Sequence, residues 1–194
     1  MHKNNTLKLT QMALLIAIQL ILSFTPLGFI ILPGLVSITI MHIPVIVGGI
    51  VMGPLYGGIL GLVFGLLSMY KATTAATSVV DQAFSPFLSG APVQSVIMCI
   101  VPRILLGVLA ALIFRALSKH LKSQGVSIAV SAGLATVSHT VLVLGCLWAL
   151  FNGLALKDVF LTIVTLNGLL EIAVAVLVAV AVCRPLLRLA NRQQ

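Results

Sequence analysis

Residues 93–117 read VQSVIMCIVPRILLGVLAALIFRAL, an almost uninterrupted apolar run with Arg103 near its middle. About 20 mostly apolar residues are enough for a helix to cross the hydrocarbon core of a bilayer. This stretch therefore predicts a membrane-spanning helix that carries a cation deep inside the membrane.

The rest of the chain has the same character. Of its 194 residues, 60% are hydrophobic and only 7% are charged, and the mean hydropathy is +1.24. Soluble domains carry roughly 25% charged residues, so this composition excludes an ordinary soluble domain. The apolar runs predict one all-α integral membrane domain over residues 1–194. Its six transmembrane helices are expected at about 9–24, 35–52, 55–69, 93–117, 126–151 and 159–183.

The distribution of basic residues predicts how these helices are oriented. With six crossings, only Lys71 and Lys157 fall on the side opposite the two termini, and Arg103 lies inside a helix. The basic residues on the side of the termini are Lys3, Lys8, Arg115, Lys119, Lys122, Arg184, Arg188 and Arg192. Because cytoplasmic loops are enriched in Lys and Arg, both termini are expected in the cytoplasm. The long loop over residues 70–92 would then be an extracellular lid between helices three and four.

Glycines recur every four residues from Gly49 to Gly65. This spacing places small residues on one helix face and lets helix backbones approach closely in a membrane. The turn at Gly53–Pro54 interrupts the run, which favours close packing within the hairpin of the second and third helices over an interface with a partner.

Polar residues inside the predicted helices are few, and each is a candidate functional residue because burying a charge in a bilayer is costly. At about 1.5 Å of rise per residue, those that fall near mid-depth come from three helices. They are Arg103, His139, Thr140, Asn167 and Glu171. Such convergence predicts a binding site within the bundle. Two alternatives stay open: Arg103 and Glu171 form only a structural ion pair, and His139 is a neutral core histidine.

Motifs for catalysis or metal binding are absent from the sequence. It has no GxxxxGK[ST] loop for nucleotide phosphates, no HExxH or GxSxG motif, and no CxxC pair among its three cysteines. We therefore expect neither an enzyme nor a bound metal or other cofactor. A channel is disfavoured, because the polar residues lie at one level and not along a path across the membrane.

Several motifs, in order along the chain, resemble one family. They are Met41–Gly49, Gly53–Gly57, Phe84–Gly90, Pro102–Gly107 and Asn167–Glu171. Together they resemble the substrate-binding S components of energy-coupling-factor (ECF) vitamin transporters, and most of all the pantothenate-specific S component. The resemblance implies a protein of the bacterial cytoplasmic membrane that captures a vitamin from outside. A transmembrane coupling protein and two cytoplasmic ATPase subunits would supply the energy.

The same resemblance implies roles for particular residues. Ala13 and Ala17 correspond to the small-residue motif by which the family docks onto the coupling protein. Arg103 is expected to pair with the carboxylate of pantothenate. Glu171 is expected either to hold Arg103 in place or to accept a hydrogen bond from the cargo, and Asn167, His139 and Thr140 to complete the hydrogen bonds. Phe84 and Ser85, on the lid, would close over the cargo.

Two other functions remain open from the sequence. A carboxylate as near to Arg103 as Glu171 would offset the positive field that an anionic cargo needs. A neutral cargo, such as a pyridoxine-like or pyrimidine vitamin precursor, would tolerate that balance better. The alternative from another class is a membrane scaffold protein whose glycine faces bind partner helices, and it would require neither a ligand nor Arg103.

Overall fold

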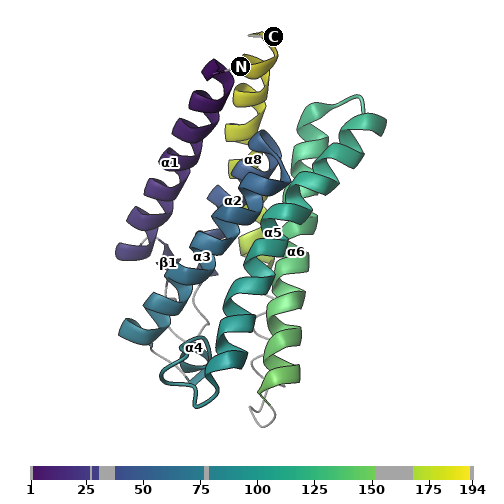
Figure 1. Cartoon of the computed structure of the whole chain (residues 1–194). Helices are drawn as coiled ribbons and strands as arrows, with labels where there is room; N and C mark the ends of the chain where they lie inside the picture. The colour runs from purple at the N-terminus through teal and green to yellow at the C-terminus, as the bar shows by residue number, and fades with distance from the viewer. Residues whose placement is uncertain (1, 27, 31–37, 77–78, 152–167, 193–194) are drawn as a thin grey trace.

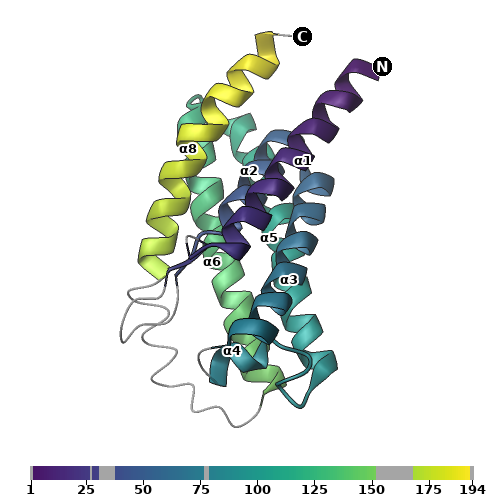
Figure 2. The ribbon, with the colours of Figure 1, turned by 90° about the vertical axis from the view of Figure 1, so that its left-hand side faces the viewer.

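The computed structural model describes residues 2–26, 28–30, 38–76, 79–151 and 168–192, and it is a bundle of long helices (Figure 1). The helices are α1 (His2–Phe24), α2 (His42–Met52), α3 (Pro54–Ala75), α4 (Val79–Ala83), α5 (Pro92–His120), α6 (Gln124–Leu150) and α8 (Gly168–Arg192). The strands are β1 (Phe29–Ile30) and β2 (Ile38–Thr39). The start of α1 and the end of α8 lie at one end of the bundle, and α4 lies at the opposite end (Figure 2).

Within the described residues, five helices are long and apolar enough to cross a membrane, namely α1, α3, α5, α6 and α8. Many of their large apolar side chains are exposed, among them Leu14, Leu66 and Leu177. Soluble monomers rarely expose contiguous apolar surface of this extent, whereas a lipid-facing surface requires it. The expected class, an all-α integral membrane protein, is confirmed. The shorter α2 has 11 residues, so at 1.5 Å per residue it covers only about half of a ~30 Å hydrocarbon core.

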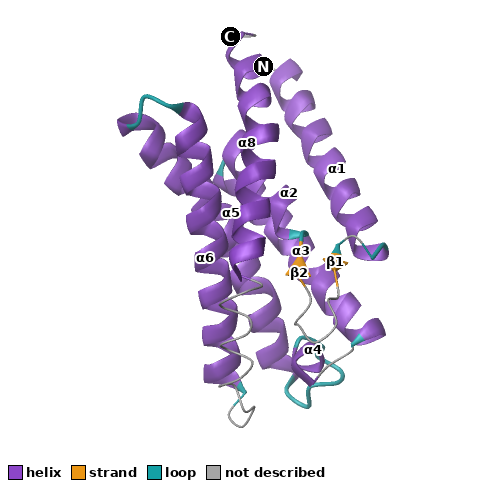
Figure 3. Cartoon of the chain, turned by 180° about the vertical axis from the view of Figure 1, so that it is seen from behind, coloured by secondary structure: helices purple, strands orange, loops and turns teal. Residues whose placement is uncertain are grey.

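The helix expected over residues 35–52 is wrong at its start. Residues 35–37 lie outside the described part of the chain, and Ile38–Thr39 forms β2, which pairs antiparallel with β1 (Figure 3). The helix α2 begins only at His42. Pro44 explains this boundary: the first N–H groups of a helix have no helical partner, so a proline in the first turn removes no hydrogen bond.

The helix expected over residues 55–69 is longer than predicted and continues to Ala75. The polar residues after Met69 suggested a loop, but they fit a helix, because Thr73 Oγ1 donates a 2.8 Å hydrogen bond to the Met69 carbonyl. The lid expected over 70–92 is correspondingly shorter. It begins after α3, contains α4 and ends where α5 begins.

The other helices differ from the ranges expected from the sequence only near their ends. The first was expected from residue 9, but α1 begins at His2. The ranges of α5 and α6 include nearly all of the expected 93–117 and 126–151. Of the expected 159–183, residues 159–167 lie outside the described part of the chain, and α8 continues through Pro185 to Arg192.

Helix α3 packs against α5 along the glycine run. A Cβ atom added at Gly57 would lie 2.5 Å from the carbonyl oxygen of Gly107, and one at Gly65 would lie 2.7 Å from that of Cys99. Gly61 faces the main chain of Arg103 in the same way. The glycines therefore pack within the molecule. The expected contact within the hairpin is present, because a Cβ added at Gly57 would lie 2.8 Å from the Cα of Gly49, but these glycines also face α5, which was not expected.

Candidate functional site

Arg103 lies inside the bundle, in the middle of α5, and is only 6% exposed. Its Nη1 donates a 2.7 Å hydrogen bond to the main-chain oxygen of Met98. Its Nε has no hydrogen-bond partner among the described residues. The guanidinium is therefore held by its own helix at one nitrogen, while part of its donor set stays free.

Two aromatic rings flank this guanidinium. Arg103 Cζ lies 5.1 Å from the ring centroid of Phe84, in the lid, and 5.5 Å from that of Phe64, on α3. Both distances allow a cation–π attraction. From α6, the ring of His139 packs against Phe64 with 6.0 Å between centroids. Of the residues that the sequence singled out, the structure thus places Arg103, His139 and Phe84 near one another.

Buried polar atoms without partners gather in this region. His139 Nε2 has no hydrogen-bond partner among the described residues. The ring nitrogens of His42 form no close, well-aligned hydrogen bond there, although the ring faces the main chain of Thr39 and Glu171. The two histidines are 7% and 1% exposed, and His139 lies close enough to His42 and Arg103 to interact with both electrostatically. Because buried polar groups are nearly always hydrogen-bonded, the unpaired Nε2 of His139 near the free Arg103 Nε, with His42 also close to His139, indicates a place for a bound molecule or water.

His42 is a site residue that sequence reasoning missed. A helix expected over 35–52 put His42 well inside a spanning segment. In the structure His42 is the first residue of α2 and follows β2 closely. The available signal was Pro44, because a proline is best tolerated in the first turn of a helix and so indicates a helix that begins just before it.

Glu171 is in the first turn of α8, and its contacts differ from those expected. Its Oε1 accepts a 2.8 Å hydrogen bond from the main-chain N–H of Thr39, which ties α8 to β2. Arg103 and Glu171, both in the described part of the chain, interact only at longer range and form no ion pair. The structural ion pair that the sequence left open is therefore not formed.

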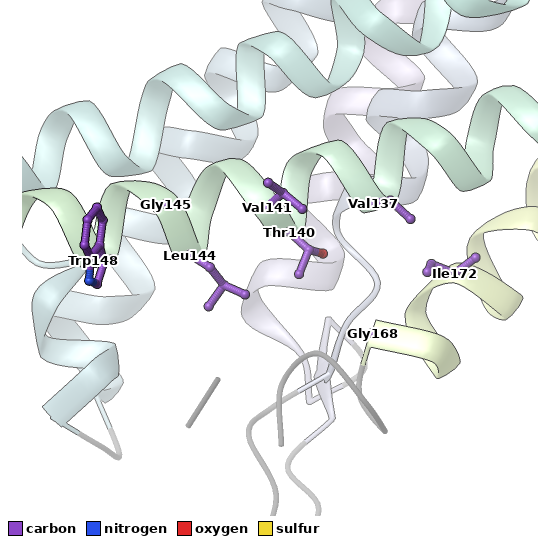
Figure 4. A pocket seen from close by; sticks show the side chains of 8 residues that line it. All are labelled: Val137, Thr140, Val141, Leu144, Gly145, Trp148, Gly168 and Ile172. Atoms are coloured by element: carbon purple, nitrogen blue, oxygen red, sulfur yellow. The ribbon is translucent and has the colours of Figure 1, made fainter. Parts of the chain in front are cut away.

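Thr140 faces a different side of α6 from its neighbour His139. It lines a groove of about 540 Å³ between α6 and α8 (Figure 4). The other lining residues are Val137, Val141, Leu144, Gly145, Trp148, Gly168 and Ile172. The Thr140 hydroxyl donates to the carbonyl of Thr136 at 3.2 Å. The structure thus separates Thr140 from Arg103, and Asn167 lies outside the described residues.

The chemistry of this arrangement is that of a binding site. No group of three or more His, Cys, Asp or Glu residues that could hold a metal ion occurs within the described ranges. The site offers a cation with a free N–H, imidazole nitrogens and aromatic walls. Such a set suits an organic anion that also carries hydroxyl or amide groups.

Comparison with known proteins decides the family. A sequence profile described as "ECF transporter, substrate-specific component" matches residues 7–183. The chain belongs to this family. A curated relative, the pantothenic acid transporter PanT of Lactococcus lactis subsp. cremoris (strain MG1363), is 32% identical over 200 aligned residues that cover 98% of this chain and 99% of the relative. This substrate-specific (S) component is thus a multi-pass protein of the cell membrane that works in transport, and its family indicates no catalytic activity.

The lid of this S component, whose described residues are 76 and 79–91, is a packed loop. Ser85 is fully buried, and its Oγ lies 2.9 Å from Thr73 Oγ1 of α3 and accepts the N–H of Leu88 at 3.3 Å. From α5, Ser95 Oγ donates to the Ala83 carbonyl at 2.7 Å. Ser85 therefore holds the lid in shape, while its neighbour Phe84 is the lid residue that meets Arg103.

Ala13 and Ala17 of this S component lie on the exposed side of α1. Large apolar side chains on the same helix, such as Ile21, are exposed as well. On the inner side of α1, Met12 and Leu15 pack against the core, and Gln19 Nε2 donates to the Leu60 carbonyl of α3 at 3.2 Å. The outer face of α1 is therefore open to lipid or to another helix.

Proposed function

We propose that this S component captures pantothenate outside the cell and passes it to an ATP-driven ECF importer. The observation that supports this most is the buried Arg103, which has a free Nε and no ion pair with Glu171. Pantothenate is an anion at neutral pH, and a guanidinium binds a carboxylate through strong, charge-assisted hydrogen bonds. The name of the L. lactis relative points to the same cargo.

The residues around Arg103 are given complementary roles in this proposal. The ring nitrogens of His139 and His42 would bind the hydroxyl and amide groups of the cargo. Phe84 would cover the cargo from the lid and exclude water, with Ser85 fixing that loop. Asn167 stays a predicted contact. Glu171 and Thr140 are given no direct contact with the cargo, because Glu171 bonds the Thr39 main chain and Thr140 lines the groove between α6 and α8.

The charge of the site favours an anion over a neutral vitamin precursor. The Glu171 carboxylate is bonded to the Thr39 main chain and not to Arg103, so it does not neutralise the guanidinium directly. A buried cation without a paired carboxylate is unfavourable on its own and becomes favourable when the ligand supplies the negative charge. A pyridoxine-like or pyrimidine cargo would leave this cation unpaired.

We also propose six crossings with both termini in the cytoplasm and the lid outside. The start of α1 and the end of α8 share one end of the bundle, and α4 in the lid lies at the other, which agrees with the excess of basic residues on the side of the termini. In this topology α2, with the residues that precede it, makes the sixth crossing.

The proposed partners are a transmembrane coupling protein and two cytoplasmic ATPase subunits. The sequence has no nucleotide-binding loop of its own, so energy must come from other chains of an ATP-driven transporter. Ala13 and Ala17, on the exposed face of α1, would let a helix of the coupling protein approach closely.

The experiment is binding of labelled pantothenate to the purified chain in nanodiscs, with wild type, Arg103→Ala and Arg115→Ala compared. Arg115 is the matched control, because it is an exposed arginine of the same helix. Wild type should bind with submicromolar affinity, Arg103→Ala should weaken binding by about 100-fold, as expected for removing one partner of a buried charge pair, and Arg115→Ala should match wild type.

Competition with unlabelled vitamins separates the alternatives. If a neutral vitamin displaces the label and pantothenate does not, the protein is an S component with another cargo. If a folded sample binds no vitamin, the scaffold function gains support. Equal binding by Arg103→Ala and wild type would refute the role of Arg103 but leave the cargo standing.

A further inference from the structure

Pro102 precedes Arg103 inside α5 and changes the hydrogen bonding of the helix there. In an α-helix each N–H bonds the carbonyl four residues earlier, and proline has no N–H. The carbonyl that Pro102 leaves without its helical donor is that of Met98. Residue 98 is fully buried, so water cannot easily take the place of the missing donor. An unpaired carbonyl in such surroundings is costly.

Arg103 supplies the missing donor. Its Nη1 reaches the Met98 oxygen at 2.7 Å, a length typical of a charge-assisted hydrogen bond. Helical side chains point back towards the N-terminus of their helix, so an arginine directly after the proline can reach the carbonyl that the proline has freed. The interaction anchors the guanidinium between Phe84 and Phe64 and leaves Nε without a partner.

We propose that Pro102 is a positioning residue for the cargo: by freeing the Met98 carbonyl it fixes the Arg103 guanidinium in the orientation that receives the cargo carboxylate. The inference rests on the proposed function, because it assigns Arg103 to the carboxylate. Replacing Pro102 by alanine would restore an N–H, and that N–H would compete with Arg103 for the Met98 oxygen. The guanidinium would then lose its anchor without losing its charge.

A second proline within a helix, Pro185, provides a control. Pro185 lies inside α8 but is exposed near its C-terminal end, far along the chain from the buried arginine. Pro185→Ala tests what restoring a helical N–H does to the bundle in general. It should leave ligand binding unchanged.

The first test is a double-mutant cycle on the full chain in nanodiscs, with pantothenate and its neutral alcohol analogue pantothenol as probes. Pro102→Ala should weaken pantothenate binding by about tenfold, the size expected when one hydrogen bond to a charged group is lost. It should change pantothenol binding by less than about twofold, because that analogue has no carboxylate to pair. In the Arg103→Ala background, Pro102→Ala should not change the affinity for pantothenate further.

Two results would overturn the inference. One is wild-type affinity in Pro102→Ala. The other is an equal loss for both probes that persists in the Arg103→Ala background, since that pattern means that Pro102 only shapes the helix. Failure of the wild-type chain to bind pantothenate would instead refute the proposed cargo.

A second measurement is independent of any cargo. NMR spectra of the chain labelled with ¹⁵N in its arginine guanidinium groups should contain one slowly exchanging Nη signal, assigned by its absence in Arg103→Ala. The signal should be lost in Pro102→Ala and retained in Pro185→Ala. If the Arg103 signal is unchanged in Pro102→Ala, Pro102 does not position the guanidinium, whatever the cargo.

Discussion

Helix α5 belongs to two regions that are built in opposite ways. Towards α3 its main chain touches the glycines of that helix, and almost no side chain lies between the two backbones. Around the Arg103 guanidinium the side chains are large, and several buried nitrogens have no partner. The first region is fully packed without a ligand, whereas the second keeps buried polar atoms that only a ligand or water could bond.

Arg103 takes part in both regions. Its main chain packs against Gly61 of α3, while its side chain reaches Met98 and the aromatic rings. Close backbone packing therefore gives a fixed platform for a side chain whose surroundings are left unsatisfied. Changes in the glycine interface should therefore damage the fold, whereas changes around the guanidinium should damage binding first.

The largest effect is expected from Gly107→Val. A Cβ at Gly107 would collide with the main chain of Gly57, and backbone cannot move aside as a flexible side chain can. Overpacking a tight interface costs about 3 kcal/mol or more in such cases. The variant should lose monodispersity and thermal stability in detergent.

The matched control for that variant is Gly125→Ala. Gly125 is in the first turn of α6, and nothing lies within 4 Å of a Cβ added there. Because alanine is a better helix former than glycine, this change should stabilise the protein by about 0.5 kcal/mol. Equal stability of the two glycine variants would contradict the view that α3 and α5 are in backbone contact.

The second-largest effect is expected from Arg103→Lys. Lysine keeps the charge but lacks the planar fork that can bond Met98 and a carboxylate at the same time. Pantothenate affinity should fall by roughly 30-fold, close to 2 kcal/mol, while thermal stability without ligand changes little. Binding isotherms and melting curves of the same preparations check both parts; full affinity in the lysine variant would mean that charge alone recognises the cargo.

A smaller effect is expected from Phe84→Ala. The Phe84 ring lies over the guanidinium, so its removal admits water and removes a cation–π contact worth about 1 kcal/mol. Affinity should fall by about fivefold, mostly through faster release of labelled pantothenate.

Phe87→Ala is the control for the lid. Phe87 belongs to the same loop, but it is 82% exposed. Its removal should leave the release rate unchanged. A lid in which both substitutions speed release equally would act by its general order and not through the Phe84 ring.

The smallest effect is expected from Glu171→Gln. The amide oxygen can still accept the Thr39 N–H, so the link between α8 and β2 survives. The lost negative charge no longer opposes an anionic cargo at long range, and pantothenate affinity should rise by about threefold. Weaker binding in calorimetry would instead show that the Glu171 carboxylate contacts the cargo.

Much of the fold could be predicted because hydropathy is a local property of the chain. Long apolar runs identified α1, α3, α5, α6 and α8, and the predicted ranges are wrong only near the ends of these helices. The start of the helix expected at 35–52 was misplaced, since an apolar run does not distinguish a strand such as Ile38–Thr39 from a helix. In α3, polar residues suggested a loop because a sequence does not show that Thr73 bonds its own helix.

By itself, the sequence determined the membrane class, the family motifs and the buried Arg103, all of which follow from residue type and order. Only the tertiary structure decided which groups meet that arginine. Met98 holds it, Glu171 bonds Thr39 instead, and His42 joins the site while Thr140 faces the other side of α6. The physical reason is that these contacts depend on the rotation and register of packed helices. Among α2, α3 and α5, small glycines set both through backbone contacts between residues far apart in the chain.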